Sequence, residues 1–291
     1  MKPTFAIIGC GKVGTALGKH LADAGYTPVG FASRSMGSAR RVADVVGVEG
    51  ACFEAPWDAA KEAGIVFITT PDHAIEETCR IIVKNRGIRE KSIVLHCSGA
   101  LPSTILSSVH SCHASAGSMH PLQSFAAENF KNPFQNIMVA VEGDEDAIQM
   151  AEAIACDLGA QPFSIRTEGK TLYHAAAVVA SNYLVTLMDL SFKLIAASGV
   201  SESDAYHVLR PIIKGTQTNI ENVGIPDALT GPIARGDAEI VEKHMAAIRA
   251  LSPDLLTQYR TLGFATIKIA LAKGTLSEDA AKQLLEIFRF D

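Results

Sequence analysis

The sequence predicts an α/β fold in which a doubly wound sheet comes first and an all-helical domain follows. Two observations support this prediction. Short apolar runs alternate with helical segments from Thr4 to about Arg166, as in sheets covered by helices on both faces. After Ile165 no strand-like run is evident, and only helical patterns continue. We therefore expect about eight strands, with one domain over residues 1–167 and a helical substrate and dimerisation domain over residues 168–291.

Composition narrows the class of protein. The chain has 291 residues, of which 48% are hydrophobic and 20% charged, which is typical of a globular protein with two domains. A net charge of −5 gives no electrostatic reason to expect nucleic acid or an anionic membrane as a partner. The longest apolar stretches, around residues 175–188, are interrupted by polar residues, and we expect them to fall short of the roughly 20 apolar residues of a membrane span.

Cysteine usage and the N-terminus predict a cytoplasmic protein. The six cysteines include no C-x-x-C pair and read as reduced, mostly buried thiols. No signal peptide precedes the first apolar run. The group His110–His113 lacks a second ligand pair at zinc spacing, so no metal site is expected.

A glycine loop lies near the N-terminus, between an apolar run at residues 4–8 and a helical segment at residues 13–24. Its glycines occupy the first, third and sixth positions. Gly9 would permit the tight turn, Gly11 would let a pyrophosphate approach the backbone, and Gly14 would let the helix pack closely on the strand. The free N–H groups of the helix would then face the phosphates. This arrangement predicts a Rossmann domain that binds a dinucleotide through Gly9, Cys10, Gly11, Lys12, Val13 and Gly14.

The second strand ends at Ser33-Arg34-Ser35, where NAD-specific Rossmann domains carry an acidic residue that binds the ribose 2′-hydroxyl. No acid stands here. A guanidinium between two hydroxyls suits a 2′-phosphate instead, because it forms paired hydrogen bonds to phosphate oxygens. We therefore predict NADP as the cofactor, with Ser33, Arg34 and Ser35 as ligands. The alternative is a solvated arginine in a surface loop.

Polar residues also follow the later strands of the predicted sheet. Loops at the carboxyl ends of such strands line the ligand crevice. Thr69, Thr70 and Pro71 follow one strand, Ser98 follows the next, and we assign them to the cofactor edge. His120 directly follows a further strand, Ser115–Met119, and is a candidate proton donor, since a histidine that titrates near neutrality suits this task. The alternative is a structural hydrogen bond in the turn from strand to loop.

The segment at residues 170–198 reads as one long helix that is apolar on most sides, and therefore buried in a bundle or an oligomer. At 100° per residue, Lys170, His174 and Ser181 fall within an arc of about 40°, and Asn182 lies about 80° from His174. A polar patch on an apolar helix is costly unless it is used. We take it as a candidate substrate site, the alternative being a solvated helix end, which fits Lys170 best.

A loop between two later helices contains Arg235. The segment Thr230–Asp237 holds two glycines and a proline, which indicates a shaped loop, and an arginine is suited to bind a carboxylate. Asp237 is expected to cap the next helix. A plain surface loop is the alternative.

Three motifs resemble those of a known family. They are His120-Pro-Leu-Gln-Ser-Phe125, His174-Ala-Ala-Ala-Val-Val-Ala-Ser-Asn-Tyr183 and Thr230-Gly-Pro-Ile-Ala-Arg-Gly-Asp237. The chain resembles, over essentially its full length, a family that joins a Rossmann-like domain to a helical domain of unassigned function, DUF2520. It is also similar in plan to the 6-phosphogluconate dehydrogenase-like superfamily, which includes pyrroline-5-carboxylate reductases, β-hydroxyacid dehydrogenases, ketopantoate reductases and prephenate dehydrogenases.

The resemblance implies roles for the polar residues. His120-Pro121 is similar to the His-Pro motif of prephenate dehydrogenases, whose histidine contacts the substrate hydroxyl. β-Hydroxyacid dehydrogenases carry a lysine and an asparagine one turn apart on the interdomain helix; here His174 follows Lys170 by one turn, and Asn182 comes two turns later. This departure leaves His120, Lys170 and His174 as candidate proton donors.

Together these observations predict an NADP(H)-dependent oxidoreductase that acts on a small carboxylate-bearing carbonyl or hydroxy compound. The resemblance to ketopantoate reductases makes a 2-oxo acid the specific expectation. Asn182 is expected to assist catalysis, and Ser181 and Arg235 to bind substrate. The alternatives are a pyrroline-5-carboxylate-type imine reductase and a protein that senses NADP(H) without turning it over. The long apolar helix predicts a homodimer formed through the helical domain.

Overall fold

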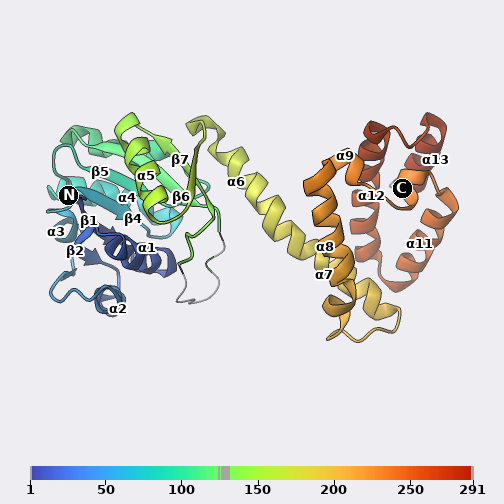
Figure 1. Cartoon of the computed structure of the whole chain (residues 1–291), viewed down its shortest axis with the longest axis horizontal. Coiled ribbons are helices and arrows are strands. Elements are labelled where there is room, and N and C mark those ends of the chain that lie inside the picture. The colour runs from blue at the N-terminus through green and yellow to red at the C-terminus, as the bar shows by residue number, and fades with distance from the viewer. Residues whose placement is uncertain (1, 124, 126–131, 290–291) are drawn as a thin grey trace. The chain divides into compact units, whose positions relative to one another are not determined.

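The computed structural model describes residues 2–123, 125 and 132–289. Within them an eight-stranded sheet has the order β3-β2-β1-β4-β5-β6-β7-β8 (Figure 1). The strands are β1 (Thr4–Ile8), β2 (Thr27–Ala32), β3 (Cys52–Phe53), β4 (Ile65–Ile68), β5 (Ile93–His96), β6 (Ser115–Pro121), β7 (Met138–Gly143) and β8 (Gln161–Ser164). The predicted doubly wound α/β fold and its strand count are confirmed.

The sheet is mixed rather than wholly parallel. Every neighbouring pair runs parallel except β6 and β7, whose antiparallel register places His120 opposite Ala140. His120 therefore lies inside a strand, one residue before its end, and not in the loop that follows it. The strand order reverses at β1: β2 and β3 are added on one side of it, and β4 and the later strands on the other. Rossmann domains open a crevice for a dinucleotide at this point.

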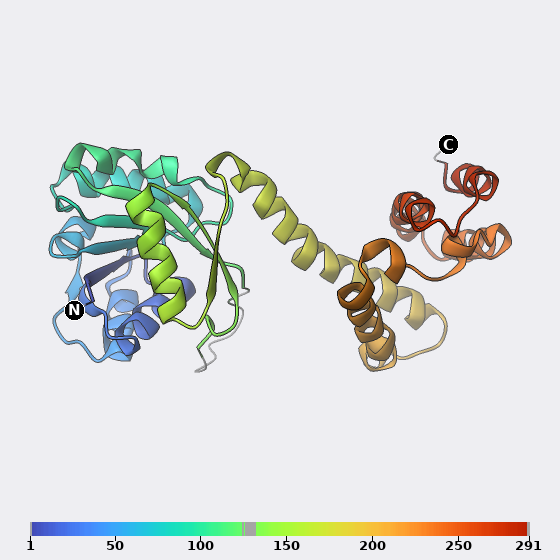
Figure 2. The same ribbon diagram turned by 45° about the horizontal axis from the view of Figure 1, so that its top comes forward.

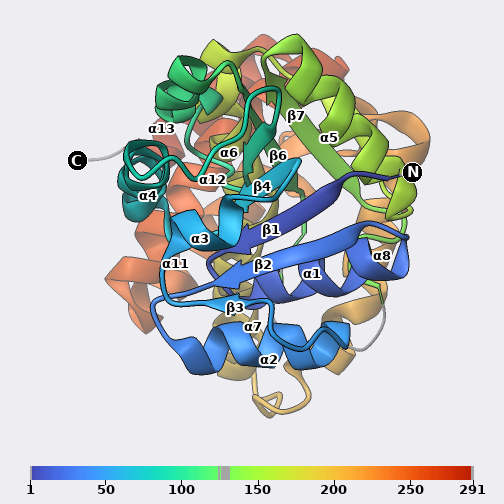
Figure 3. The same cartoon turned by 90° about the vertical axis from the view of Figure 1, so that its left-hand side faces the viewer.

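Helices cover both faces of the sheet. Alternate residues of each strand point to opposite faces, so every strand contributes side chains to both helical layers. In β1, Phe5 and Ile7 pack with one helical layer, whereas Ala6 and Ile8 pack with the other. The two layers are seen on either side of the strands in Figures 2 and 3. One consists of α1 (Lys12–Asp23), α2 (Met36–Val46) and α5 (Glu145–Asp157), and the other of α3 (Pro56–Ala60), α4 (Asp72–Lys84) and the 3₁₀ segment η1 (Ser103–Cys112).

The chain after β8 is helical, as predicted. Its elements are η2 (Thr167–Gly169), α6 (Lys170–Val178), the π-helical turn η3 (Val179–Tyr183), α7 (Leu184–Ala197), α8 (Ala205–Val223), α9 (Ile225–Ala228), α10 (Pro232–Arg235), α11 (Ala238–Leu251), α12 (Pro253–Lys273) and α13 (Glu278–Phe288). These helices have a hydrophobic core of their own. It joins Leu190 of α7 with apolar residues of α11, α12 and α13, such as Val241, Ile267 and Leu284.

The chain divides into two compact units, residues 1–180 and residues 181–291. This division falls after the predicted domain boundary at residue 167, because the first turn of α6 contacts β6 through Lys170 and Tyr173. Lys170 and His174 are therefore part of the Rossmann unit.

One continuous helical stretch, Thr167–Ala197, is long and apolar enough to cross a membrane by length and composition. Only 6% of the apolar 18-residue segment in this stretch is buried within the single chain. The apolar stretches that seemed too short for a span in the sequence thus lie on one helix that meets both criteria. A helix that is apolar all round is equally expected where subunits bury it.

Candidate functional site

The glycine loop has the geometry that phosphate binding requires. Gly9 has φ +108°, and a Cβ there would lie 2.6 Å from the backbone of Thr69 and Thr70. A Cβ at Gly14 would lie 2.2 Å from the carbonyl oxygen of Gly9, so this glycine allows α1 to pack against the loop. A Cβ at Gly11 would meet nothing within 4 Å, which leaves open space beside its backbone. The tight turn at Gly9 and the close packing at Gly14 are those predicted from the sequence, and the approach of a pyrophosphate to Gly11 stays a prediction.

A pocket of about 700 Å³ opens at this loop. It combines the loop with the ends of β2, β3 and β4 and with the start of α4. Its lining includes the predicted cofactor residues Gly9, Cys10, Gly11, Lys12, Val13, Ser33, Arg34, Ser35, Thr69, Thr70 and Pro71. The remaining lining residues are Ile8, Ala32, Ser38, Glu54, Pro56, His73, Ala74 and Thr78.

These surroundings fit a dinucleotide. The first turn of α1 holds no acidic residue, and Gly11 makes no side-chain cap, so the helix N-terminus faces the pocket without a competing anion. The hydroxyl oxygen of Thr70 is buried without a hydrogen-bond partner. Such an orphaned polar atom at the rim of a pocket is suited to a bound ligand.

Two of the predicted cofactor residues also hold the fold together. The hydroxyl of Thr69 donates to the carbonyl oxygen of Gly9 at 2.6 Å and ties the end of β4 to the glycine loop. The thiol of Cys10 is turned inward, to the carbonyl of Ala32, and burial raises its pKa to about 12. Cys10 and Thr69 can therefore offer backbone atoms to a cofactor, whereas their side chains serve the fold.

Ser98 belongs to a turn that adjoins the pocket. Its hydroxyl donates to Oδ2 of Asp72 at 2.8 Å and accepts from the backbone N–H groups of Ala100 and Leu101. Asp72 lies between the pocket-lining residues Pro71 and His73. The loop after β5 is thus fixed beside the dinucleotide pocket. Pro71 precedes α4 as its N-cap rather than forming its first helical residue.

His120 and His174 come together at this turn. A Cβ added at Gly99 would lie 2.7 Å from Nε2 of His120 and 2.8 Å from Cδ2 of His174. Nδ1 of His120 is hydrogen-bonded to the hydroxyl of Tyr173, at 2.7 Å. Of the polar patch predicted from helical periodicity, His174 borders the same turn as His120. Tyr173, which the patch did not include, makes the hydrogen bond to His120.

The charge state of His120 differs from expectation. A histidine that titrates near neutrality was predicted, but burial lowers the pKa of His120 to about 4, with further lowering from Lys170 and His174. Asp72 acts in the opposite direction. His120 is therefore neutral at pH 7 and can act as a neutral hydrogen-bond donor or as a proton acceptor.

Lys170 is not placed as an exposed proton donor. Its side chain is 1% exposed, its ammonium lies 3.5 Å from Oε1 of Glu142, and it donates to the hydroxyl of Ser118. Burial lowers the pKa of Lys170, against the effect of Glu142. Of the three candidate donors, His120 and His174 border the Gly99 turn, whereas Lys170 is enclosed behind them.

The remaining candidates belong to the second unit. Ser181 and Asn182 are exposed in the π-helical turn η3, an irregularity that is frequent at functional sites. Arg235 ends the short helix α10 within the predicted loop, and its guanidinium is already bound to Oδ2 of Asp237 at 2.8 Å. Asp237 stands at the N-cap position of α11 but makes no capping hydrogen bond, because its carboxylate pairs with Arg235. The expectation of a capping side chain is wrong.

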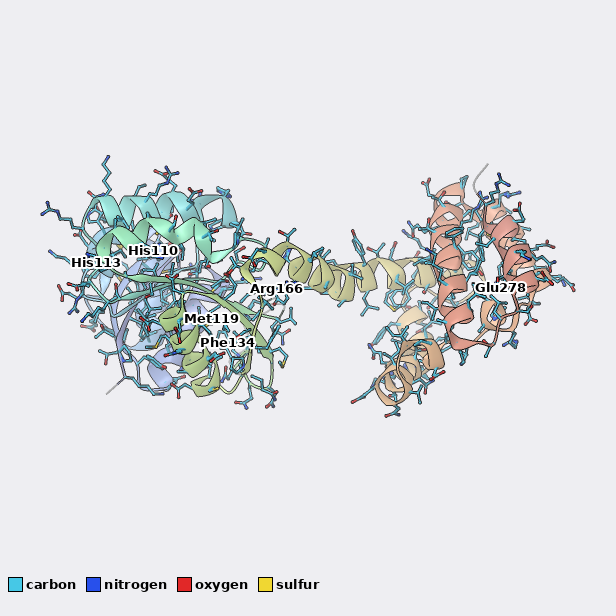
Figure 4. The ribbon with its side chains drawn as sticks, turned by 90° about the horizontal axis from the view of Figure 1, so that it is seen from above. His110, His113, Met119, Phe134, Arg166 and Glu278 are labelled. Atoms are coloured by element: carbon cyan, nitrogen blue, oxygen red, sulfur yellow. The ribbon has the colours of Figure 1, made fainter. Side chains whose placement is uncertain are left out.

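No group of three or more potential metal ligands occurs among the described residues. The motif His110–His113 lies well away from Arg166, which immediately precedes the η2–α6 segment (Figure 4). His110 instead pairs with Asp144, at 2.8 Å.

Sequence reasoning missed Tyr173, Gly99, Glu142 and the pocket residue His73. Tyr173 lies three residues after Lys170, so it shares that face of α6, and this spacing could have indicated it. Glu142 lies inside an apolar strand, Met138–Gly143, where an acid is rare unless paired. Gly99 could have been inferred from the Ser98-Gly99-Ala100 turn. His73 had no comparable signal, because its place depends on how α4 is oriented.

Two family models match the chain. A Rossmann-like domain matches residues 2–121, and the domain of unknown function DUF2520 matches residues 137–266. The chain belongs to the family that joins these two domains. A search of curated proteins finds no match to this DUF2520 chain.

Solved structures share the fold of this DUF2520 protein along nearly its whole length. A protein from Thermotoga maritima is 26% identical, with a TM-score of 0.64 and 98% of each chain covered. A candidate NADP oxidoreductase from Bacteroides fragilis is 24% identical, with a TM-score of 0.72, over 92% of this chain and 98% of that one. A reductive aminase from Aspergillus terreus, in complex with NADPH and ethyl levulinate, is 15% identical, with a TM-score of 0.69, over 99% of this chain and 100% of that one.

Proposed function

We propose that this DUF2520 protein is an NADP(H)-dependent oxidoreductase of the cytoplasm that acts on a small carboxylate-bearing carbonyl or hydroxy compound, with a 2-oxo acid as the specific case. The observation that carries the proposal is the meeting of His120 and His174 at Gly99, in a turn held beside the dinucleotide pocket. The similarity in fold to the candidate NADP oxidoreductase and the NADPH-bound reductive aminase adds support.

The pocket residues suit the parts of the cofactor. Gly11 and the N-terminus of α1 would receive the pyrophosphate, and Ser33, Arg34 and Ser35 would receive a 2′-phosphate. The turn at Ser98 and Gly99 would border the nicotinamide, which supplies or accepts the hydride when it is bound.

The residues at Gly99 would handle the proton. If the hydroxyl of Tyr173 donates to Nδ1 of His120, the ring of neutral His120 carries its proton on Nε2, the atom that faces Gly99. This N–H can donate a hydrogen bond to a carbonyl oxygen and stabilise the charge that develops there. In the reverse direction, the neutral imidazole in its other tautomer accepts the hydroxyl proton.

One observation favours the imine-reductase alternative. A histidine with a pKa of about 4 transfers a proton at pH 7 only with difficulty. A protonated imine receives hydride without needing a further proton in that step, and such a substrate would place less demand on His120.

A substrate panel tests the proposal. The purified protein is mixed with NADPH and, in turn, 2-oxo acids, β-keto acids and cyclic imines, and loss of NADPH absorbance is followed. We expect turnover of at least one 2-oxo acid. Turnover of cyclic imines alone would establish the alternative. Tight NADPH binding without turnover of any compound would contradict the enzyme assignment and leave the sensor interpretation.

Cofactor preference is tested at Arg34, which is exposed at the pocket. We expect the parent protein to bind NADPH at least about tenfold more tightly than NADH, because a bidentate arginine–phosphate pair contributes about 1.5–3 kcal/mol. In Arg34→Ala this margin should largely disappear while NADH affinity stays the same. Fluorescence titrations measure both constants. Arg41→Ala is the matched control, since Arg41 does not line the pocket. Equal affinities in the parent would refute the assignment of Ser33-Arg34-Ser35.

We further propose a homodimer formed through the helical unit. Large apolar side chains stand exposed on α7 and α8, among them Val185 at 69% and Ile212 at 67%. Apolar surface of this extent is typical of subunit interfaces. Light scattering after size-exclusion chromatography should give twice the chain mass of 30.9 kDa. A monomer at micromolar concentration would contradict this assignment.

A further inference from the structure

A buried carboxylate connects three segments of the Rossmann unit. Glu142, on β7, is 1% exposed. Its two oxygens accept from the backbone N–H of Ser103 at 2.9 Å, the hydroxyl of Ser103 at 2.7 Å and the hydroxyl of Thr167 at 3.0 Å. The beginning of η1, the strand β7 and the segment η2 are thus held together at one point.

Lys170 adds a fourth and a fifth segment to this cluster. The residue begins α6, and its ammonium lies 3.5 Å from Glu142 while donating to the hydroxyl of Ser118 on β6. Both charges are 1% exposed, so the pair is enclosed by protein. Burying a lysine and a glutamate gives little net stability compared with apolar residues of the same shape. The proposed reaction uses neither group directly.

The contacts between α6 and β6 form two successive rungs. Ser118 and His120 are two residues apart on a strand and therefore point to the same face. Lys170 and Tyr173 are three residues apart on a helix and share a face as well. The first rung is Lys170 to Ser118, and the second is Tyr173 to His120, at 2.7 Å. The two rungs therefore share one register of α6 on β6.

We propose that Lys170 is a positioning residue, whose ammonium, held by Glu142 and Ser118, fixes the register of α6 on β6 so that Tyr173 and His174 meet His120 at Gly99. The inference rests on the proposed function only in treating His120 as a group of the reaction site. The side chain of Lys170 is enclosed by protein, and the proposed reaction gives it no contact with the substrate.

The same ammonium contributes a positive charge near the ring of His120. The titratable groups that act on or contact this ring are Lys170, Tyr173 and His174 of α6, Asp72 of α4 and His96 of β5. After burial, Lys170 is the largest cause of the low pKa of His120, His174 lowers it as well, and Asp72 raises it. Lys170 therefore both places His120 against Tyr173 and keeps it neutral.

The test is an NMR titration of the histidine rings in the full chain without cofactor or substrate. ¹⁵N-labelled parent, Lys170→Met and the control Lys193→Met are compared, since Lys193 also pairs with a carboxylate, Asp189, but is exposed. We expect the midpoint of His120 to rise by about one pH unit or more in Lys170→Met. The ring should also lose its single tautomer, because the Tyr173 contact loosens. Lys193→Met should change neither property.

A double variant serves as the control for a folding defect. Lys170→Met leaves the carboxylate of Glu142 with three donors, and Lys170→Met combined with Glu142→Gln removes both buried charges while keeping similar shapes. The double variant should fold and show the same rise in the His120 midpoint. An unchanged midpoint and tautomer in either folded variant would overturn the proposal. If both variants unfold, Lys170 serves stability rather than positioning, and the proposal also fails. Because no turnover is measured, a parent without reductase activity leaves this test intact.

Discussion

Replacing His120 by glutamine is expected to lower kcat/KM for the accepted substrate by a factor of about 10²–10⁴. His120 presents Nε2 at the Gly99 turn, and the neutral ring is the best placed group to donate to, or accept from, the reacting oxygen. Glutamine keeps a polar side chain of similar reach but cannot exchange a proton at pH 7. Binding of NADPH should stay within about twofold, because His120 does not line the dinucleotide pocket.

The chain offers a matched control for this change. His244 is also hydrogen-bonded through Nδ1 to a tyrosine hydroxyl, that of Tyr259 at 2.9 Å, but the pair lies in the helical unit. His244→Gln should retain parent activity. Tyr173→Phe should give an intermediate loss, since it frees the tautomer of His120 without removing the ring. Full kcat/KM in His120→Gln would refute its role in proton handling.

The protein is also expected to lose stability as the pH falls from about 6.5 to 5. Burial lowers the pKa of His96 to about 3 and that of His120 to about 4, whereas an unfolded histidine titrates near 6.5. Within this window the unfolded chain binds protons that the native chain does not, so acid favours unfolding. Each histidine should lower the free energy of unfolding by about 1.4 kcal/mol per pH unit once the pH is well below 6.5.

Urea unfolding at several pH values measures this dependence. His120→Gln should remove about half of the slope that the two histidines cause. Identical slopes in the parent and in His120→Gln would contradict the low pKa of His120. Above about pH 7 both proteins should show little dependence on these groups, since the two states are then equally deprotonated.

Local patterns in the sequence were sufficient to predict the strands and helices of the first half of the fold. The spacing of Gly9, Gly11 and Gly14 predicted a strand, a tight turn and a helix in succession, and β1, the glycine turn and α1 stand there. The strand count followed from apolar runs such as Ile65–Ile68, which is buried on both faces. The antiparallel β7 could not be predicted, because pairing direction depends on how the chain returns to the sheet.

The candidate site was predictable only in part. Helical periodicity on α6 grouped Lys170 with His174, and the strand end indicated His120; the roles assigned to them stay predictions. That Tyr173 contacts His120, and that Glu142 holds Lys170, depends on the register between α6 and β6. The neutral state of His120 depends on burial, which residue type alone does not determine.

The most direct test of the account is the transfer of labelled hydride. NADPH carrying deuterium at both C4 positions is incubated with the protein and the substrate panel, and products are analysed by mass spectrometry. We expect one deuterium on the former carbonyl carbon of a 2-oxo acid, transferred at a rate that falls in His120→Gln. NADPH bound tightly, with no deuterium in any product of the panel, would contradict it.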